Sequence, residues 1–475
     1  MNFRSISESV VWSVGNAATS QAISLLAFLI TARLISPAAF GIVAIATLTV
    51  EVMKRVLVEP LAAGLMASHQ PDEQKFNRCF SAIVTLSGAG SIMVFLAAYP
   101  IEWLIGAPSQ ATVLQLMSTM LLGSGLSRTH EVWYSKRFEF RLLAIRSSAA
   151  AICGAVTGVS MALLGFGIWS LVAQQIVNTA VAFLLLFTFS KWRPKLDISL
   201  RRSFGQLSAA SHLIITSVAG FIGGEADVFF VTAYLGAGAG GIYSAAKRLI
   251  MAASMIVINS VQNVILVGFA AKSRTPEAYR LHLDSLRIFA LIITPMYVGL
   301  SVLAFDVVAL LLDEKWSRSG GILSVLAVAA LGQGLTWLET NYLLAAGADW
   351  SRTKVIVVTA VITVLALPFL APHGMLAVAY GMAAINWVSL FCTGAAAALN
   401  ANERLTGPFI VLSLPAIGAG SMFVASSFID PSWSPAWCLL LWPPGLLLVY
   451  VGTVCFVGFP VLKNLAAVVR MAPQD

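Results

Sequence analysis

The chain has 475 residues, of which 59% are hydrophobic and only 11% are charged, with a mean hydropathy of +0.87. A soluble domain carries about 25% charged residues, so this composition excludes a water-soluble globular protein. The net charge is +8, but the basic residues lie in short patches between long apolar runs, which argues against nucleic-acid binding. The five cysteines are scattered and form no Cys-x-x-Cys pair, so neither a disulfide framework nor a metal site is expected.

Continuous apolar runs of about twenty residues predict an all-α integral membrane protein, because a helix satisfies its own backbone hydrogen bonds in lipid. The first run is longer than a signal-peptide core and carries Asn16 and Arg33, so we interpret it as a span rather than a cleaved signal. About fourteen transmembrane helices are expected, at 12–35, 40–66, 78–98, 111–132, 141–164, 167–189, 207–232, 239–270, 287–311, 319–345, 354–371, 374–399, 407–428 and 436–460.

The distribution of basic residues gives this set of spans an orientation. If the N-terminus is cytoplasmic, 22 of the 29 Lys and Arg residues fall in inward segments and three fall in outward segments. Inward loops of membrane proteins carry this excess of positive charge. The pattern therefore predicts that both termini are cytoplasmic.

A weak internal repeat recurs at about 200 residues. Leu122–Leu126 (LGSGL) matches Leu331–Leu335 (LGQGL), and Gly41-Ile42 matches Gly241-Ile242. An even number of spans per copy predicts two parallel six-helix pseudo-repeats, a class of transporter that holds its substrate between the halves and rocks them alternately. The predicted domains are an N-lobe at 1–200 (spans 1–6), a C-lobe at 201–402 (spans 7–12) and two C-terminal helices at 403–475.

The second span carries four ionisable side chains, each of which costs roughly 2.5–3.5 kcal/mol to insert at bilayer depth. They are Glu51, Lys54, Arg55 and Glu59, and the spacing of Glu51, Arg55 and Glu59 places them on one face of a continuous helix. Two interpretations stay open: the face lines a water-filled cavity, or it is a self-neutralising ladder that packs against another helix.

The seventh and eighth spans form a predicted antiparallel hairpin around Gly236–Gly240, which places Asp227 and Lys247 at equal depth. We expect an ion pair between Asp227 and either Lys247 or Arg248, with Glu225 nearby. The pair could line the cavity or only lower the cost of insertion.

Other polar side chains inside predicted spans are candidates for gating or for lining a cavity. Glu131 and Glu339 lie near the cytoplasmic ends of the fourth and tenth spans, where they could gate the inner mouth or be interfacial. Asn16, Asn259 and Gln262 fall on polar helix faces, which also serve helix–helix packing. The five histidines are dispersed, and the sequence contains no P-loop, H-E-x-x-H or G-x-S-x-G motif, so we expect no enzyme activity and no cofactor.

Three segments resemble the polysaccharide transporter family of the MOP superfamily, whose Wzx-type members flip lipid-linked oligosaccharides. They are the proline–x–x–aromatic–glycine segment in Arg33–Gly41, the inner-side segment Arg137–Arg141 followed by Gly165–Val172, and Leu235–Leu249 with its Gly241-Ile242-Tyr243. The resemblance spans most of residues 10–400. It implies two six-helix lobes around a central cavity, and the two helices beyond twelve depart from the common core.

The resemblance also implies the substrate, an oligosaccharide repeat unit on undecaprenyl pyrophosphate that is turned across the bacterial inner membrane for exopolysaccharide or lipopolysaccharide synthesis. A basic cavity would suit the pyrophosphate, and the cations available for it are Arg33, Lys54, Arg55, Lys247 and Arg248. Besides membrane lipids, a polysaccharide polymerase and chain-length machinery are possible partners. Alternatives are a multidrug or small-solute exporter on the same scaffold and a membrane polysaccharide polymerase or ligase.

Overall fold

The computed structural model describes residues 3–68, 72–195, 211–270, 276–428 and 434–470, with side chains at 19–68, 72–195, 214–255, 278–428 and 434–457. Within these ranges the secondary structure is helical, without a strand, and each of the fourteen predicted ranges is occupied by helix. Ten helices are long and apolar enough to cross a membrane, and the described part of α1 adds a shorter apolar helix, Thr19–Leu34. The chain is therefore a multi-pass membrane protein, while the count of fourteen spans stays a prediction.

The helices divide into two compact units. Unit 1 comprises Met1–Arg248 and Thr363–Met375, and unit 2 comprises Leu249–Ile362 and Leu376–Asp475, so the division falls inside α10 and α14. The predicted lobes at 1–200 and 201–402 rest on the sequence repeat, and they remain a prediction.

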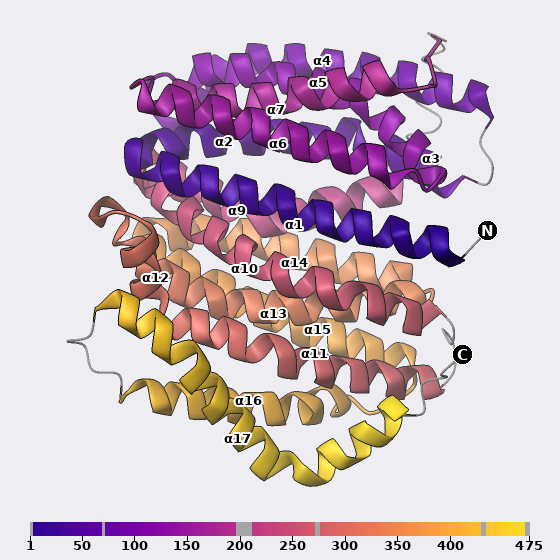
Figure 1. Ribbon diagram of the computed structural model, residues 1–475, viewed down its shortest axis with the longest axis vertical. Helices are drawn as coiled ribbons and strands as arrows, with labels where there is room; N and C mark the ends of the chain where they lie inside the picture. The colour runs from indigo at the N-terminus through magenta and orange to yellow at the C-terminus, as the bar shows by residue number, and fades with distance from the viewer. Residues whose placement is uncertain (1–2, 69–71, 196–210, 271–275, 429–433, 471–475) are drawn as a thin grey trace. The chain divides into compact units, whose positions relative to one another are not determined.

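Unit 1 is built mainly from the first helices of the chain, with α4 beside α5 and α6 beside α7 (Figure 1). Its elements are α1 (Phe3–Leu34), α2 (Pro37–Leu57), α3 (Glu59–Ala67), α4 (Glu73–Ile105), α5 (Gln110–Lys136), α6 (Phe140–Leu163), α7 (Ile168–Phe189), α9 (Ser211–Leu235), the start of α10 (Ala237–Ala270) and η2 (Ala371–His373).

Unit 2 contains the rest of α10 and the later helices, with α11 packed against both α13 and α16, and α16 against α17. Its elements are α11 (Pro276–Val302), α12 (Ala304–Leu311), η1 (Glu314–Trp316), α13 (Ser319–Ala345), most of α14 (Asp349–Leu370), α15 (Met375–Asn400), α16 (Gly407–Ser426) and α17 (Pro435–Arg470). One core joins α11, α13, α15 and α16 through Phe289, Leu335, Leu390 and Val411.

Local sequence explains where several helices begin and end. Ser36 is extended and Pro37 opens α2, a position where proline's missing N–H costs nothing. The Asp72 side chain caps α4 by accepting from the Lys75 N–H at 2.8 Å, and Gly106 ends the same helix in the left-handed region.

The predicted helix at 40–66 is interrupted, which corrects the expectation of one continuous charged face. Val58 separates α2 from α3, because Pro60 has no N–H to donate and its ring clashes with the carbonyl four residues earlier. Glu59 therefore belongs to α3, while Glu51, Lys54 and Arg55 belong to α2. The three residues at i, i+4 and i+8 do not form one uninterrupted ladder.

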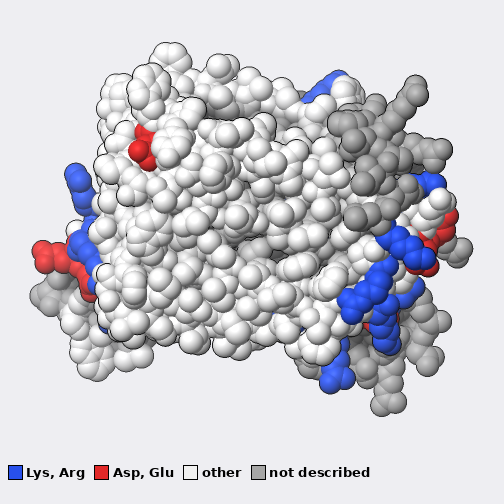
Figure 2. Space-filling view, turned by 90° about the horizontal axis from the view of Figure 1, so that it is seen from above, with Lys and Arg blue, Asp and Glu red and all other residues white. Residues whose placement is uncertain are grey.

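The outer surface of the helices is apolar in the way lipid requires. Large side chains in the middle of helices are widely exposed, among them Leu96 (68%), Val156 (60%) and Leu448 (73%). A soluble protein rarely exposes such contiguous apolar surface. Figure 2, which views the molecule from above, shows a broad uncharged middle with Lys, Arg, Asp and Glu gathered towards the two ends.

Candidate functional site

The starts of α2 and α10 cross with their backbones in direct contact. A Cβ atom at Gly41 would overlap the carbonyl oxygen of Ala237, and a Cβ at Gly241 would overlap the carbonyl oxygen of Pro37. Gly41 and Gly241 are 200 residues apart, as are Pro37 and Ala237, so the two contacts are reciprocal, as contacts across a two-fold axis are. These glycines belong to the segments that carry the family resemblance, and they are required by the close approach of two main chains.

Lys247 is held on α10 by three acceptors from α9. Its ammonium group donates to Gly224 O at 2.6 Å, to Glu225 Oε2 at 3.0 Å and to Asp227 Oδ1 at 2.9 Å. An ammonium has three N–H donors, so all of them are used. The predicted ion pair of Asp227 is confirmed, with Lys247 rather than Arg248 as its partner.

Asp227 is 1% exposed and both of its oxygens are occupied. Oδ1 also accepts from the Val228 N–H at 2.8 Å, and Oδ2 accepts from the Tyr243 hydroxyl at 3.0 Å. The cluster combines one positive charge, on Lys247, with two negative charges, on Glu225 and Asp227. Its positive charge is therefore already neutralised and is not available to an anionic ligand. Tyr243 is a member that the sequence analysis missed, although its position four residues before Lys247 places both on one helix face.

Arg248 lies beside this cluster but has different neighbours. Its guanidinium lies over the ring of Phe28 on α1, 5.2 Å from the centroid, and near Phe40 on α2, at 5.7 Å. No ion pair joins it to a described residue. A guanidinium held by aromatic faces keeps its charge available for an anion.

Arg55, near the end of α2, has a similar environment. Its guanidinium lies 4.7 Å from the centroid of Phe221 on α9, and it too has no ion pair within the described residues. Its neighbour Lys54 instead pairs with Glu51 at 2.9 Å. Among the four predicted cavity cations of α2 and α10, both lysines thus pair with carboxylates, whereas Arg55 and Arg248 have no ion pair with a described carboxylate.

The two arginines lie at different depths along α2. Arg248 contacts Phe40, and fifteen residues separate Phe40 from Arg55, which corresponds to about 22 Å along a helix.

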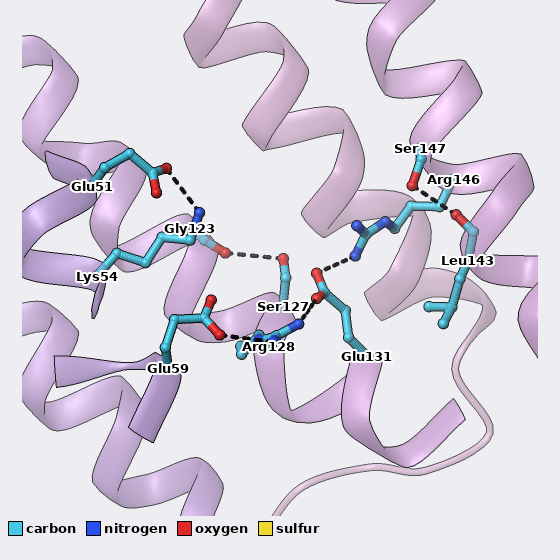
Figure 3. A network of polar contacts seen from close by, with 10 residues as sticks. All are labelled: Glu51, Lys54, Glu59, Gly123, Ser127, Arg128, Glu131, Leu143, Arg146 and Ser147. Carbon is cyan, nitrogen blue, oxygen red and sulfur yellow. Dashed lines mark hydrogen bonds and ion pairs between the residues drawn. The ribbon is translucent and has the colours of Figure 1, made fainter. Parts of the chain in front are cut away.

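A second charged network joins α3, α5 and α6 (Figure 3). Arg128 donates to Glu59 Oε2 at 2.8 Å and to Glu131 Oε2 at 2.7 Å, and Arg146 donates to the other oxygen of Glu131. Arg128 and Arg146 were not among the predicted site residues. The Arg128-x-x-Glu131 spacing predicts one of these contacts, but the partners on α3 and α6 are set only by packing.

Glu339 lies in unit 2, where it pairs with a histidine. Its Oε2 is 2.9 Å from His282 Nε2, and both side chains are completely buried. Glu131 and Glu339 thus have different partners, and neither lies in the Asp227 cluster.

The remaining predicted site residues fall into two groups. Arg33 is exposed at the last turn of α1. The side chains of Asn16, Asn259 and Gln262 lie outside the described residues.

The fold matches solved membrane transporters. The lipid II flippase MurJ, in an inward closed conformation, aligns over 95% of this chain and 100% of its own with a TM-score of 0.74 at 15% identity. A multidrug resistance MATE family transporter of the MOP superfamily, in an inward-facing conformation, aligns over 85% of this chain and 94% of its own with a TM-score of 0.53 at 15% identity. The chain thus shares its fold with these two solved transporters.

The family is defined by sequence. Residues 30–320 match the model of the polysaccharide biosynthesis protein family, and the chain belongs to that family. The succinoglycan biosynthesis transport protein ExoT of Rhizobium meliloti (strain 1021) is 28% identical over 69% of this chain and 67% of its own length. The lipopolysaccharide biosynthesis protein WzxC of Escherichia coli (strain K12) is 21% identical over 67% of this chain and 66% of its own length. The chain thus spans about two thirds of these relatives, and the predicted resemblance is confirmed.

Proposed function

We propose that this protein flips oligosaccharide repeat units linked to undecaprenyl pyrophosphate across the bacterial inner membrane, for exopolysaccharide or lipopolysaccharide synthesis. The family match over residues 30–320 carries the proposal, and the fold shared with a lipid II flippase and the name of ExoT as a transport protein support it. The protein acts as a transporter by alternating access between two lobes, and it catalyses no covalent step. Both termini are cytoplasmic, and polymerase and chain-length proteins receive the product.

In this proposal, Arg55 and Arg248 bind the pyrophosphate group of the substrate. A pyrophosphate is a dianion or more at neutral pH, and a guanidinium without a carboxylate partner offers planar, charge-assisted hydrogen bonds to its oxygens. Phe40, which Arg248 contacts, lies about 22 Å from Arg55 along α2, so the headgroup meets the two arginines one after the other as it crosses. Lys247 plays no direct part in binding, since its three donors are occupied.

The test is deletion of the gene in its host followed by complementation. Deletion should abolish surface polysaccharide and make undecaprenyl-linked repeat units accumulate in the inner leaflet. Arg55→Ala and Arg248→Ala should each fail to restore export while the protein still inserts at wild-type level. Arg137→Ala is a matched control, because Arg137 also stacks on an aromatic ring, 3.7 Å from the Trp133 centroid, yet lies outside the candidate site.

Two outcomes would contradict the proposal. Unchanged surface polysaccharide after deletion, together with new sensitivity to cationic drugs, would point to an exporter like the MATE family. Full export by both arginine variants would remove the basic residues from the mechanism.

A further inference from the structure

The LGQGL segment places a glutamine at the middle of α13, a helix long and apolar enough to cross the membrane. Gln333 lies near the centre of Ser319–Ala345, and its side chain is exposed. No hydrogen bond joins this side chain to another described residue. An amide without a hydrogen-bond partner is costly to place in hydrocarbon, so Gln333 faces water rather than lipid.

The two glycines beside Gln333 fix this orientation. A Cβ atom at Gly332 would lie 3.5 Å from the ring of Trp387 on α15, and a Cβ at Gly334 would lie 3.3 Å from Ile293 Cδ1 on α11. Consecutive residues on a helix point about 100° apart. Because the glycines face the neighbouring helices on either side, Gln333 points at the open face between them.

This open face continues towards the C-terminal end of α13. The residues three, four, seven and eight positions after Gln333 lie on the same side of the helix and are half-buried: Thr336, Trp337, Thr340 and Asn341. The one charged residue of α13, a helix described in full, is Glu339, which is buried against His282 of α11. The five open-face residues, Gln333 included, thus form a polar, uncharged surface, here called the neutral face.

The neutral face retains unused hydrogen-bonding groups. Thr336 and Thr340 donate to main-chain carbonyl oxygens of their own helix, and their own oxygens still accept. Asn341 donates through Nδ2 to the Trp337 carbonyl oxygen at 2.7 Å, which leaves its Oδ1 as an acceptor. Gln333 has both an acceptor and two donors available. The Trp337 ring adds an apolar surface with an N–H at its edge.

This combination of groups matches a saccharide. Sugar hydroxyl groups both donate and accept hydrogen bonds, and the C–H faces of a sugar ring are apolar and pack against aromatic rings. Ligand sites commonly combine aromatic surface with a few polar groups that fix orientation. An anion would need cations, which the neutral face lacks. Gln333 and Asn341 are eight residues apart, which is about 12 Å along the helix and accommodates a disaccharide.

The repeat-equivalent face of α5 has a different chemistry. In the LGSGL segment the two glycines also face neighbouring helices, α7 and α4. Ser124 stands in the place of Gln333, and Arg128 stands in the place of Trp337. Arg128 forms an ion pair with Glu131 at 2.7 Å. The two segments thus share their glycine packing, while α13 has neutral polar and aromatic side chains where α5 has an ion pair.

We propose that the neutral face of α13 binds the sugar part of the lipid-linked substrate. Trp337 packs against a sugar ring, and Gln333 and Asn341 exchange hydrogen bonds with its hydroxyl groups. The inference rests on the proposed function, and it assigns the sugar to residues other than the arginines proposed for the pyrophosphate. The neutral face also selects among saccharides, because a hydroxyl or amide left without a partner loses its hydrogen bonds to water and gains none.

The first experiment tests whether water reaches Gln333 and does not depend on flipping. In full-length protein whose five native cysteines are replaced by alanine, Gln333→Cys is treated in open membrane fragments with a charged, water-soluble thiol reagent. The new thiol should react. Leu96→Cys is the matched control and should not react, because Leu96 is 68% exposed on the apolar outer surface. A reaction at Gln333→Cys as slow as at Leu96→Cys would overturn the proposal.

The second experiment measures the binding of two probes to the purified full-length protein in detergent. One is the lipid-linked oligosaccharide of the host, and the other is undecaprenyl pyrophosphate without sugar. Gln333→Leu and Trp337→Leu should each weaken binding of the first probe about tenfold and leave the second unchanged. Arg55→Ala should weaken the binding of both. Ser124→Ala, at the equivalent position of α5, is the matched control and should bind both probes like the wild type.

The outcomes separate the inference from the proposed function. Wild-type affinity of both α13 variants for the lipid-linked oligosaccharide would overturn the sugar site and leave the proposed function standing. An equal loss of affinity for the two probes would also overturn it, because the neutral face would then not distinguish sugar from pyrophosphate. If the wild-type protein binds neither probe, the proposed function fails, and the inference that rests on it fails as well.

Discussion

Glu131 and Glu339 occupy similar places near the ends of α5 and α13, yet they are neutralised in different ways. Glu131 receives Arg128 on one oxygen and Arg146 on the other, and its side chain is 21% exposed. Glu339 is fully buried and has one imidazole. Each arginine brings a permanent positive charge and a planar set of donors to the Glu131 carboxylate. The first site links α5 to α6 and α3 through two ion pairs, whereas the second links α11 to α13 through one hydrogen-bonded contact.

The internal sequence repeat identifies the residue of unit 1 that is equivalent to Glu339. The LGSGL and LGQGL segments are 209 residues apart, and at this offset Glu339 corresponds to His130, the residue before Glu131. His130 is also completely buried, where its Nδ1 lies 3.0 Å from the Ser190 hydroxyl. Each unit thus buries one ionisable group at this position, which contacts a serine hydroxyl in unit 1 and a histidine in unit 2.

The largest effect is expected from removing the partner of Glu339. His282→Ala leaves a carboxyl group in an apolar core without its counter-charge, which should destabilise the protein by about 3–5 kcal/mol. Adding Glu339→Gln should recover a large part of this loss, because the amide carries no charge. Unfolding in detergent at pH 8 measures both variants. Equal destabilisation of the single and double variants would mean that packing rather than charge dominates at this pair.

A smaller effect is expected at the arginine-held site. Arg128→Ala removes the contacts to Glu59 and Glu131, but both carboxylates are partly exposed and Glu131 keeps Arg146. The expected loss is about 1–2 kcal/mol, between the values for surface and buried pairs. Arg128→Lys, which can hold one of the two carboxylates, should lie between wild type and alanine by the same unfolding measurement. A loss as large as that of His282→Ala would erase the distinction between the two sites.

The smallest effect is expected for the pair within α2. Glu51 and Lys54 lie three residues apart on one helix and are 34% and 27% exposed. Such a pair contributes about 0.3–0.5 kcal/mol, so Glu51→Gln should leave the Tm almost unchanged. A strong destabilisation would show that this pair is shielded from water in the folded protein and belongs with the buried groups.

The sequence predicted the contacts that lie close along the chain or across a tight turn. The hairpin around Gly236 fixed Asp227 opposite Lys247, because two antiparallel helices joined by a short turn keep equal distances from it. It did not distinguish Lys247 from Arg248, since neighbouring residues on a helix point about 100° apart and the rotation of α10 is set by packing. The interruption at Val58 was readable from Pro60 but was not predicted.

The sequence by itself determined the membrane class, the location of the helical segments and the family, because hydrophobicity and helix periodicity are local properties of the chain. Only the tertiary structure decided which charges are neutralised and by which partner. Glu59 meets Arg128 from 69 residues away, and His282 meets Glu339 from 57 residues away. These distances along the chain carry no periodic signal, so the pairing depends on which helix faces pack together. The same packing places Arg55 and Arg248 against aromatic rings, whereas Lys247 forms ion pairs with two carboxylates.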